Sequence, residues 1–236
     1  GVDVIVHAAA LKQVPTCEFD PWEALETNVL GARNVIDAAI RCEVPKVVAL
    51  STDKSCQPCT TYGKTKALLE SLFIRANAYT GRHQSRFSVT RYGNVVASRG
   101  SVVPIFLEQR RAGVVTVTHP EATRFWMSLD DAVQLVLRAV AQMQGGEIFI
   151  PKVVSAKVPD VAMALAPGCR VEVTGLRAGE KLHELLVSED EAPQTVETED
   201  GFIICPVAPS WPFTVPVESR PVPAGFSYRS DSHPQP

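Results

Sequence analysis

The sequence predicts an α/β fold of the doubly wound type, in which helices cover both faces of a mainly parallel sheet. Three short apolar runs, at 4–8, 46–51 and 87–92, have the length and composition of buried strands. Helical stretches separate these runs along the chain. A strand, helix, strand order requires crossover connections, which place parallel strands side by side.

Local signals predict each helix of the first half. Asp20-Pro21 supplies an acidic cap and a proline in the first turn, and apolar residues at helical spacing continue to about Arg41. A polar loop at 52–61 follows the second strand. A second long helix is predicted from about Tyr62 to Tyr79.

The pattern changes after Gly93. Ser128, with Asp131 three residues later, resembles a capping box at a helix start. From about Asp190 the chain is rich in proline and acidic residues, and we expect an irregular tail with short strands at 201–205 and 226–228. The other expected elements are a loop at 93–101, a helix near 103–112, a strand near 114–118, a strand at 147–151, a helix at 157–166, a strand near 170–174 and a helix beginning around Gly179.

The composition limits the classes of function. Apolar residues make up 45% of the chain and charged residues 21%, as in an ordinary soluble domain. The net charge of -3 gives no electrostatic reason to expect nucleic acid or an anionic membrane as a partner. No apolar run approaches the ~20 residues of a spanning helix. The six scattered cysteines favour reduced thiols in a cytoplasmic protein over a disulfide framework.

The start of the chain has the pattern of an interior strand, without an initiator Met or a signal peptide. A dinucleotide fold needs a Gly-rich turn after its first strand, and no G-x-G-x-x-G occurs here. Gly31 lies inside a predicted helix and cannot serve. We therefore expect the first strands of the sheet, and a short C-terminal helix, to be missing from this sequence.

Tyr62 and Lys66 lie four residues apart at a helix start, so both side chains project from one face. A lysine beside a tyrosine is expected to lower the tyrosine pKa and to make Tyr62 a proton acceptor for an alcohol that loses hydride. The spacing alone is weak evidence, because an exposed amphipathic helix produces it by chance. Its position directly after a buried strand favours catalysis, since ligands bind at the carboxyl ends of such strands.

Asp53 and Lys54 place a potential acid beside a potential base in the same loop. A surface ion pair is the ordinary interpretation of such a dipeptide, but the strand end and the Tyr-Lys helix favour a catalytic one. A catalytic Lys54 must be neutral part of the time. Burial and positive charge from Lys66 or an oxidised nicotinamide are expected to lower its pKa.

These residues carry a resemblance to known enzymes. Tyr62-x-x-x-Lys66 after Leu50-Ser51-Thr52 resembles the extended short-chain dehydrogenase/reductase superfamily, which has a Rossmann-like fold. More narrowly, the chain resembles the soluble, configuration-inverting UDP-N-acetylglucosamine 4,6-dehydratases of the polysaccharide biosynthesis protein family. The runs that carry this resemblance are His7–Pro15, Thr27–Gly31, Ser51–Lys54, Arg91–Val95, Ser98–Pro104, Thr123–Trp126 and Arg177–Glu184.

The resemblance implies a mechanism in which Thr52 and Lys66 assist the catalytic residues Tyr62, Asp53 and Lys54. Tyr62 would take the proton of the sugar 4-hydroxyl while hydride passes from C4 to NADP. Lys54 would then remove the C5 proton, and Asp53 would protonate the departing 6-hydroxyl. Return of hydride to C6 and of a proton to the opposite face of C5 gives net loss of water with inversion. In that family this opens the route to pseudaminic acid, a sugar of bacterial flagellins.

Two sequence differences favour the soluble inverting type. Retaining hexose dehydratases carry Asp-Glu where this chain has Asp53-Lys54. Larger membrane-anchored relatives carry Met in place of Tyr62.

The resemblance also implies ligand contacts. NADP would contact Ala8, Ala9, Tyr62, Lys66 and Val95, although core packing is an alternative for the two alanines. The UDP-sugar would contact Lys12, Ser51, Thr52, Asn94, Arg99, Gly100, Ser101, Val102, Val103, Arg124, Arg177 and Glu180.

Arginines suit a diphosphate because guanidinium groups bind it bidentately, although each one is more often a solvated surface residue. Arg177 is expected beside a helix N-terminus, and Glu180 at the ribose. Residues 1–92 would form the C-terminal part of the NADP-binding domain, and 93–236 would mainly bind the nucleotide sugar. We expect a cytoplasmic homo-oligomer without a metal.

The chain departs from the family pattern in the catalytic loop, where Gln57 and Thr60 replace two usual Asn residues. Ala97 stands where a Gly is usual. Cys56 and Cys59 have C-x-x-C spacing, which makes a thiol-redox function a minor alternative. Two other hypotheses remain. One is a nucleotide-sugar epimerase, which needs no acid-base pair to eliminate the 6-hydroxyl, and the other is a non-catalytic fragment.

Overall fold

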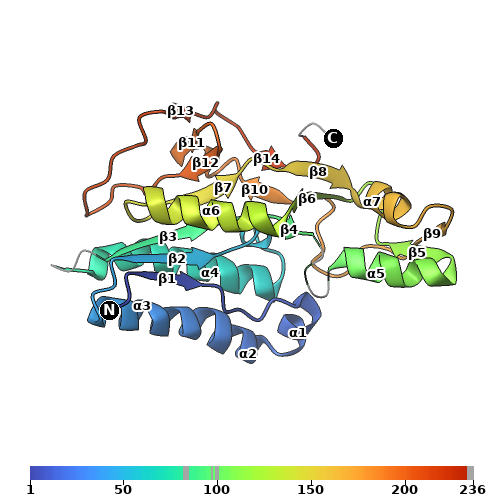
Figure 1. Cartoon of the computed structure of the whole chain (residues 1–236), viewed down its shortest axis with the longest axis horizontal. Coiled ribbons are helices and arrows are strands. Elements are labelled where there is room, and N and C mark those ends of the chain that lie inside the picture. Colours follow the sequence, from blue (N-terminus) through green and yellow to red (C-terminus); the bar gives the residue numbers. More distant parts are fainter. Residues whose placement is uncertain (82–84, 97, 99–100, 233–236) are drawn as a thin grey trace.

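The computed structural model describes residues 1–81, 85–96, 98 and 101–232, and a seven-stranded sheet forms its centre (Figure 1). The strand order is β1-β2-β3-β7-β12-β11-β13. The first four strands run parallel and confirm the predicted doubly wound parallel sheet. They are β1 (Val4–His7), β2 (Lys46–Leu50), β3 (Arg86–Thr90) and β7 (Ile148–Pro151).

Three antiparallel strands extend this sheet beyond β7. They are β12 (Gly201–Ile204), β11 (Thr195–Glu197) and β13 (Arg220–Pro221). β12 is one of the short strands expected in the tail. The expectation of an otherwise irregular tail is wrong for β11, because this strand pairs with β12 and completes a hairpin on the main sheet.

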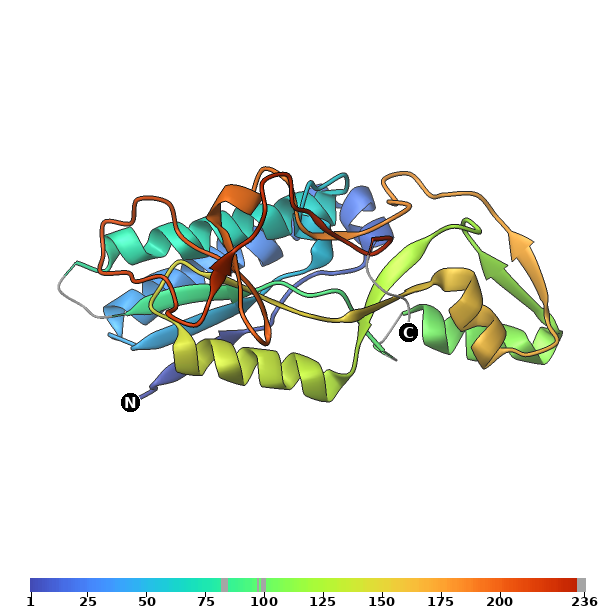
Figure 2. The same cartoon turned by 90° about the horizontal axis from the view of Figure 1, so that it is seen from above.

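Helices cover both faces of the sheet. α3 (Gly31–Arg41) and α4 (Thr61–Ala76) lie on one face, and α6 (Leu129–Gln142) lies on the other (Figure 2). Val47 of β2 packs into the core under α3 and α4, whereas the next residue, Val48, packs against α6. The strand is apolar on both faces for this reason, as its continuous apolar run predicted.

The predicted helix ends follow their local signals. Asp20 accepts a hydrogen bond from the backbone N–H of Glu23, at the start of α2 (Pro21–Leu25). A π-helical turn at Glu26–Leu30 joins α2 to α3. The capping box of Ser128 and Asp131 is present at the start of α6. The α-helix α1 (Val14–Phe19) was not predicted.

A smaller lobe projects beyond the carboxyl ends of the parallel strands (Figure 1). It contains α5 (Val102–Gln109) and α7 (Val158–Leu165), which pack on the parallel strand pair β5 (Val114–Val117) and β9 (Arg170–Val173). A three-stranded sheet connects it to the main body. Its strands are β4 (Asn94–Val95), β6 (Thr123–Met127) and β8 (Val154–Lys157).

The helix expected to begin around Gly179 is absent. Gly179 has a φ of 75°, in the left-handed region, which is incompatible with a right-handed helix. The Glu180 carboxylate accepts a hydrogen bond from the backbone N–H of Arg177 and holds a turn there. The chain then continues to β10 (Leu185–Val187), which pairs with β14 (Tyr228–Arg229).

The main sheet crosses the expected division at residue 92, because β7 pairs with β3. Separate cofactor and substrate roles for the two parts remain a prediction. Across the described ranges, none of the helices has both the length and the apolar character needed to traverse a bilayer.

Replacement of Phe73 by Ala tests the core under α4. Phe73 is fully buried, and the centre of its ring lies 5.8 Å from that of His7 and 6.0 Å from that of Phe87. The cavity left behind should lower the free energy of unfolding by about 3–5 kcal/mol, measured by denaturant titration. Phe19→Ala is the control, because Phe19 is 90% exposed and should cost under about 0.5 kcal/mol. Equal losses in both variants would contradict this core.

Candidate active site

Two adjoining cavities lie at the carboxyl ends of the parallel strands. Their volumes are about 450 and 490 Å³, and they share Lys54, Asn94, Ser101 and Arg177 among their lining residues. This is the position that a doubly wound sheet offers to a ligand.

The structure brings most of the predicted site residues to these cavities. The first is lined by Ala8, Lys12, Ser51, Thr52, Lys54, Tyr62, Lys66, Asn94, Val95, Ser101 and Arg177, and the second adds Val102, Arg124 and Glu180. Asp53 is buried and bonded to Lys54. Ala9 and Val103 line neither cavity, and Val103 is buried in α5. Arg99 and Gly100 lie outside the described residues.

The catalytic loop leaves β2 and makes one 3₁₀ turn at Asp53–Ser55. The Thr52 hydroxyl donates to Asp53 Oδ1 at 2.9 Å. The backbone N–H of Asp53 donates to the carbonyl of Tyr92 at 3.0 Å, just beyond β3. These bonds fix Asp53 at the ends of two neighbouring strands.

α4 begins against this loop and delivers Tyr62 and Lys66 to the first cavity. Thr60 caps the helix, with its hydroxyl accepting from the backbone N–H of Gly63 at 3.1 Å. A side chain at Gly63 would overlap the carbonyl oxygen of Lys54, so glycine permits this close approach. Lys66 Nζ donates to the carbonyl of Leu50 at 2.6 Å.

The two departures from the family pattern have separate structural consequences. Thr60 is an effective N-cap in place of Asn, since both residue types cap well. Gln57 has a φ of 46°, in the left-handed region. Asn adopts that region more readily than Gln, so the substitution adds backbone strain beside the site.

A buried ionic network supports the loop from behind. Glu70 Oε1 accepts from the hydroxyls of Ser51 and Ser55, both at 2.6 Å. Arg91 donates to both Glu70 oxygens, at 3.0 and 2.7 Å, and to both oxygens of Glu191, at 3.0 and 2.8 Å. The network therefore ties α4, both sides of the catalytic loop and the C-terminal segment together.

Lys54 has carboxylates on two sides. Its Nζ lies 2.9 Å from Asp53 Oδ1 and 3.4 Å from Glu184 Oε1. Burial acts to lower the pKa of Lys54, but Asp53 and Glu184 together raise it above its ordinary value. The expectation of a lowered pKa is therefore wrong, because it left out these two anions.

Tyr62 also differs from expectation. Burial, the largest effect, raises its pKa to about 12, and the opposing effects of Lys54 and Thr52 do not outweigh it. Lys66 donates to Leu50, and burial lowers the pKa of Lys66 to about 8. The chain by itself therefore keeps the phenol protonated, contrary to the predicted lowered pKa.

Arg124 and Glu180 bond to each other at the second cavity. Arg124 Nη2 donates to Glu180 Oε1 at 2.8 Å, and its Nη1 donates to the carbonyls of Thr123 and Leu182. Both side chains thus hold the turn that follows Arg177. Arg177 is exposed and lines both cavities, but the expected helix N-terminus beside it does not exist.

The sequence did not predict a role for four residues that the structure places at the site: Glu70, Arg91, Glu184 and Glu191. Arg91 and Glu184 lie in runs that carry the family resemblance, but no role was assigned to either. Spacing gives no signal for them, because their partners come from distant parts of the chain.

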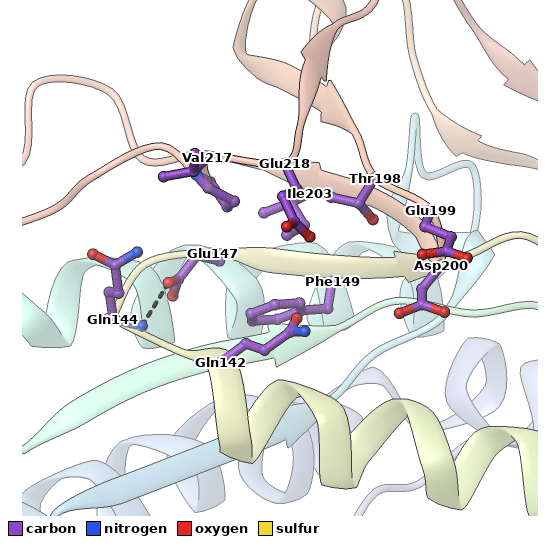
Figure 3. A pocket seen from close by; sticks show the side chains of 11 residues that line it. Gln142, Gln144, Glu147, Phe149, Thr198, Glu199, Asp200, Ile203, Val217 and Glu218 are labelled. Atoms are coloured by element: carbon purple, nitrogen blue, oxygen red, sulfur yellow. Dashed lines mark hydrogen bonds between the residues drawn. The ribbon is translucent and has the colours of Figure 1, made fainter.

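A larger cavity, of about 640 Å³, lies between the end of α6 and the segments around Asp200 and Glu218 (Figure 3). Glu147 points toward it, but its carboxylate is satisfied by the backbone N–H groups of Gln144 and Gly145 and by Ser88. This cavity has no acid-base pair like that of Asp53 and Lys54.

Cys56 and Cys59 lie in different surroundings and are not joined to each other. Cys56 is buried with its Sγ 3.5 Å from Glu191 Oε2, whereas Cys59 is exposed, and both are free thiols. Over the part of the chain that the structure describes, no three His, Cys, Asp or Glu side chains group together as metal ligands.

Comparison with known proteins identifies the family. The family model described as "Polysaccharide biosynthesis protein" matches residues 1–206. The chain belongs to this family.

Known proteins resemble this chain in sequence and in structure over most of its length. A UDP-N-acetylglucosamine 4,6-dehydratase (inverting) from Campylobacter jejuni, strain 81-176, is 47% identical over 99% of this chain and 73% of the relative. A UDP-glucose 4-epimerase from Rickettsia canadensis is 46% identical over 86% of this chain and 61% of the relative. The X-ray structure of Pen from Bacillus thuringiensis has a TM-score of 0.89 at 38% identity, over 97% of this chain and 71% of that one.

The phenol of Tyr62 should ionise at a higher pH than an ordinary tyrosine. Phenolate absorbance assigned to Tyr62, as the difference between the unmodified protein and Tyr62→Phe, should develop near pH 12. Burial disfavours the charged form, so the midpoint lies above the ordinary value of about 10. A midpoint at or below the ordinary value would contradict this.

Replacement of Glu70 by Gln should destabilise the protein by about 3 kcal/mol, because it leaves the buried Arg91 charge short of a partner. Denaturant unfolding measures this loss. Glu197→Gln is the matched control, since Glu197 pairs with the more exposed Lys152 and should cost less than about 1 kcal/mol. A loss in Glu70→Gln no larger than in the control would contradict the supporting role of the network.

Proposed function

We propose that the chain carries the active site of a UDP-N-acetylglucosamine 4,6-dehydratase that inverts C5. The observation that carries this proposal is the contact between Lys54 Nζ and buried Asp53, 2.9 Å apart, with Lys54 and Tyr62 lining the same cavity. Oxidation at an alcohol needs a proton acceptor such as Tyr62, whereas loss of the 6-hydroxyl needs an additional acid and base. The 47% identical relative named as an inverting dehydratase supports the same reaction.

The acid and base reach their working forms by one proton transfer. The contact between Lys54 Nζ and Asp53 Oδ1 favours the ammonium form of Lys54 at the start of the reaction. Transfer of a proton from Lys54 Nζ to Asp53 gives a neutral amine and a carboxylic acid. Lys54 then accepts the C5 proton, and Asp53 gives its proton to the departing 6-hydroxyl. The proton that Tyr62 takes from the 4-hydroxyl equals the one that must return to the opposite face of C5, so the protons balance.

A nicotinamide dinucleotide, NADP in this proposal, would be held by Ala8, Tyr62, Lys66 and Val95, which line the first cavity. Small Ala8 leaves room at the end of β1, and Lys66 adds a positive side chain. The bound cofactor would supply reversible acceptance of hydride. Tyr62 would accept the proton of the sugar 4-hydroxyl as a phenolate, a form that the positive charge of an oxidised nicotinamide beside it would favour. Thr52 would orient Asp53.

The UDP-sugar would extend across both cavities. Arg177 and Lys12 are exposed cations at their walls and suit the diphosphate. Glu180 and Arg124 would shape the nucleotide end. The product would enter biosynthesis of pseudaminic-acid-type sugars, which are used in flagellin glycosylation. The enzyme would be a cytoplasmic homo-oligomer.

A nucleotide-sugar 4-epimerase is the second candidate. The 46% identical relative named as a UDP-glucose 4-epimerase favours it. An epimerase would use Tyr62 and the cofactor but would not eliminate the 6-hydroxyl. Loss of water is therefore the measurement that separates the two candidates.

The proposed reaction is tested with UDP-N-acetylglucosamine and NADP in deuterated water. We expect a 4-keto-6-deoxy product with deuterium at C5 and inverted C5 configuration. Lys54→Met and Asp53→Asn should each lower the rate by about 10²–10⁴-fold, because each removes one proton-transfer group. A 4-epimer without loss of water, or retained C5 configuration, would contradict the proposal, and absence of NADP binding would support the non-catalytic hypothesis.

A further inference from the structure

Glu184 is a buried carboxylate that the proposed reaction does not yet use. It is 2% exposed, and its Oε1 lies 3.4 Å from Lys54 Nζ. Arg124 Nε lies 3.8 Å from the same oxygen. Within the described residues, Glu184 Oε2 is buried without a hydrogen-bond partner.

The backbone of Glu184 is fixed on both sides. Its N–H donates to Ser230 Oγ at 2.9 Å, and its carbonyl accepts from the N–H of Ser230 at 3.0 Å. The next residue begins β10, which pairs with β14. The main chain therefore holds this carboxylate at the second cavity, which it lines together with Lys54.

A buried carboxylate with an unsatisfied oxygen is unfavourable unless a nearby charge compensates for it. Among the described residues, Lys54 and Arg124 are the cations that lie within 4 Å of the Glu184 carboxylate. Arg124 is already bonded to Glu180, whereas Lys54 is the base of the proposed reaction. Glu184 is thus placed where its charge acts on the protonation of Lys54.

We propose that Glu184 is a positioning residue that acts through Lys54, stabilising the ammonium form that the lysine adopts after it takes the C5 proton. This inference rests on the proposed dehydration. Asp53 cannot supply the same stabilisation late in the reaction, because it carries the proton for the 6-hydroxyl. Glu184 takes part in no proton transfer of the proposed reaction, so its carboxylate stays available to stabilise the ammonium form and makes the amine a stronger base.

The sign of the effect follows from the charges that face Lys54. Asp53 and Glu184 favour its protonated form, Arg124 opposes it, and Tyr62 is neutral up to high pH. Loss of the Glu184 charge should therefore lower the pKa of Lys54 and weaken it as a base. A role in packing alone would lower activity equally at every pH and would leave the titration of Lys54 in place.

Glu184→Gln tests this inference with two measurements. In protein labelled with ¹³C at lysine Cε, the Lys54 signal, assigned by its loss in Lys54→Arg, is titrated by NMR. We expect Lys54 to remain protonated beyond the ordinary lysine midpoint in the unmodified protein, and its midpoint to fall by about one pH unit in Glu184→Gln. As the pH rises, the rate of deuterium incorporation at C5 in Glu184→Gln should reach its plateau at a lower pH than in the unmodified protein. The plateau rate should also be lower.

Two further variants complete the design. Glu184→Asp retains the charge and should keep a midpoint closer to that of the unmodified protein, while Glu197→Gln removes a carboxylate paired with Lys152 and should leave Lys54 unchanged. The inference is overturned if the Lys54 midpoint does not move in Glu184→Gln. It is also overturned if the midpoint falls in Glu184→Asp as far as in Glu184→Gln. If Glu184→Gln does not fold, a Lys54 midpoint at or below the ordinary value in the unmodified protein overturns it instead.

The two proposals fail in different ways. The NMR titration needs no turnover, so an unmoved Lys54 midpoint contradicts only the role of Glu184. Absence of water loss from UDP-N-acetylglucosamine contradicts the dehydration, and with it the use of Lys54 as its base.

Discussion

The buried ion pair of Arg91 and Glu70 is the interaction on which the site depends. Arg91 follows β3, Glu70 lies on α4, and Glu191 brings the C-terminal segment to the same guanidinium. Glu70 also holds Ser51 and Ser55 on either side of the catalytic residues. Removal of one partner of a buried pair leaves an uncompensated charge, at a cost of about 3–5 kcal/mol. Sheet, helix and catalytic loop are therefore held in one arrangement.

The same network explains why the two active-site lysines differ. Glu70 raises the pKa of Lys66, but burial has the larger effect and lowers it to about 8. The oxygens of Glu70 are engaged by Arg91 and the two serines. Lys54 instead faces Asp53 and Glu184 directly, and these anions outweigh burial. The nearest carboxylates, rather than the extent of burial, decide which lysine has the higher pKa.

The catalytic pair also bears on the choice between dehydratase and epimerase. Relatives with these two names are 47% and 46% identical to the chain, so overall identity does not discriminate between the reactions. The discriminating feature is chemical. In the proposed reaction Asp53 and Lys54 transfer the protons while Glu184 stabilises Lys54, and elimination of the 6-hydroxyl, unlike epimerisation, needs such an acid and base.

The sequence by itself determined the parallel strands, the helix starts at Asp20 and Ser128, and the location of the site after β2. These features depend on residues close together in the chain, whose periodicity and capping are local. Tertiary structure alone decided the pairing of β11 with β12, the turn at Gly179 and the charges around Lys54. Sequence reasoning misjudged the ionisation of Lys54 and Tyr62 because Coulomb interaction and burial depend on distances in space, and Glu184 reaches the site only when the chain has folded.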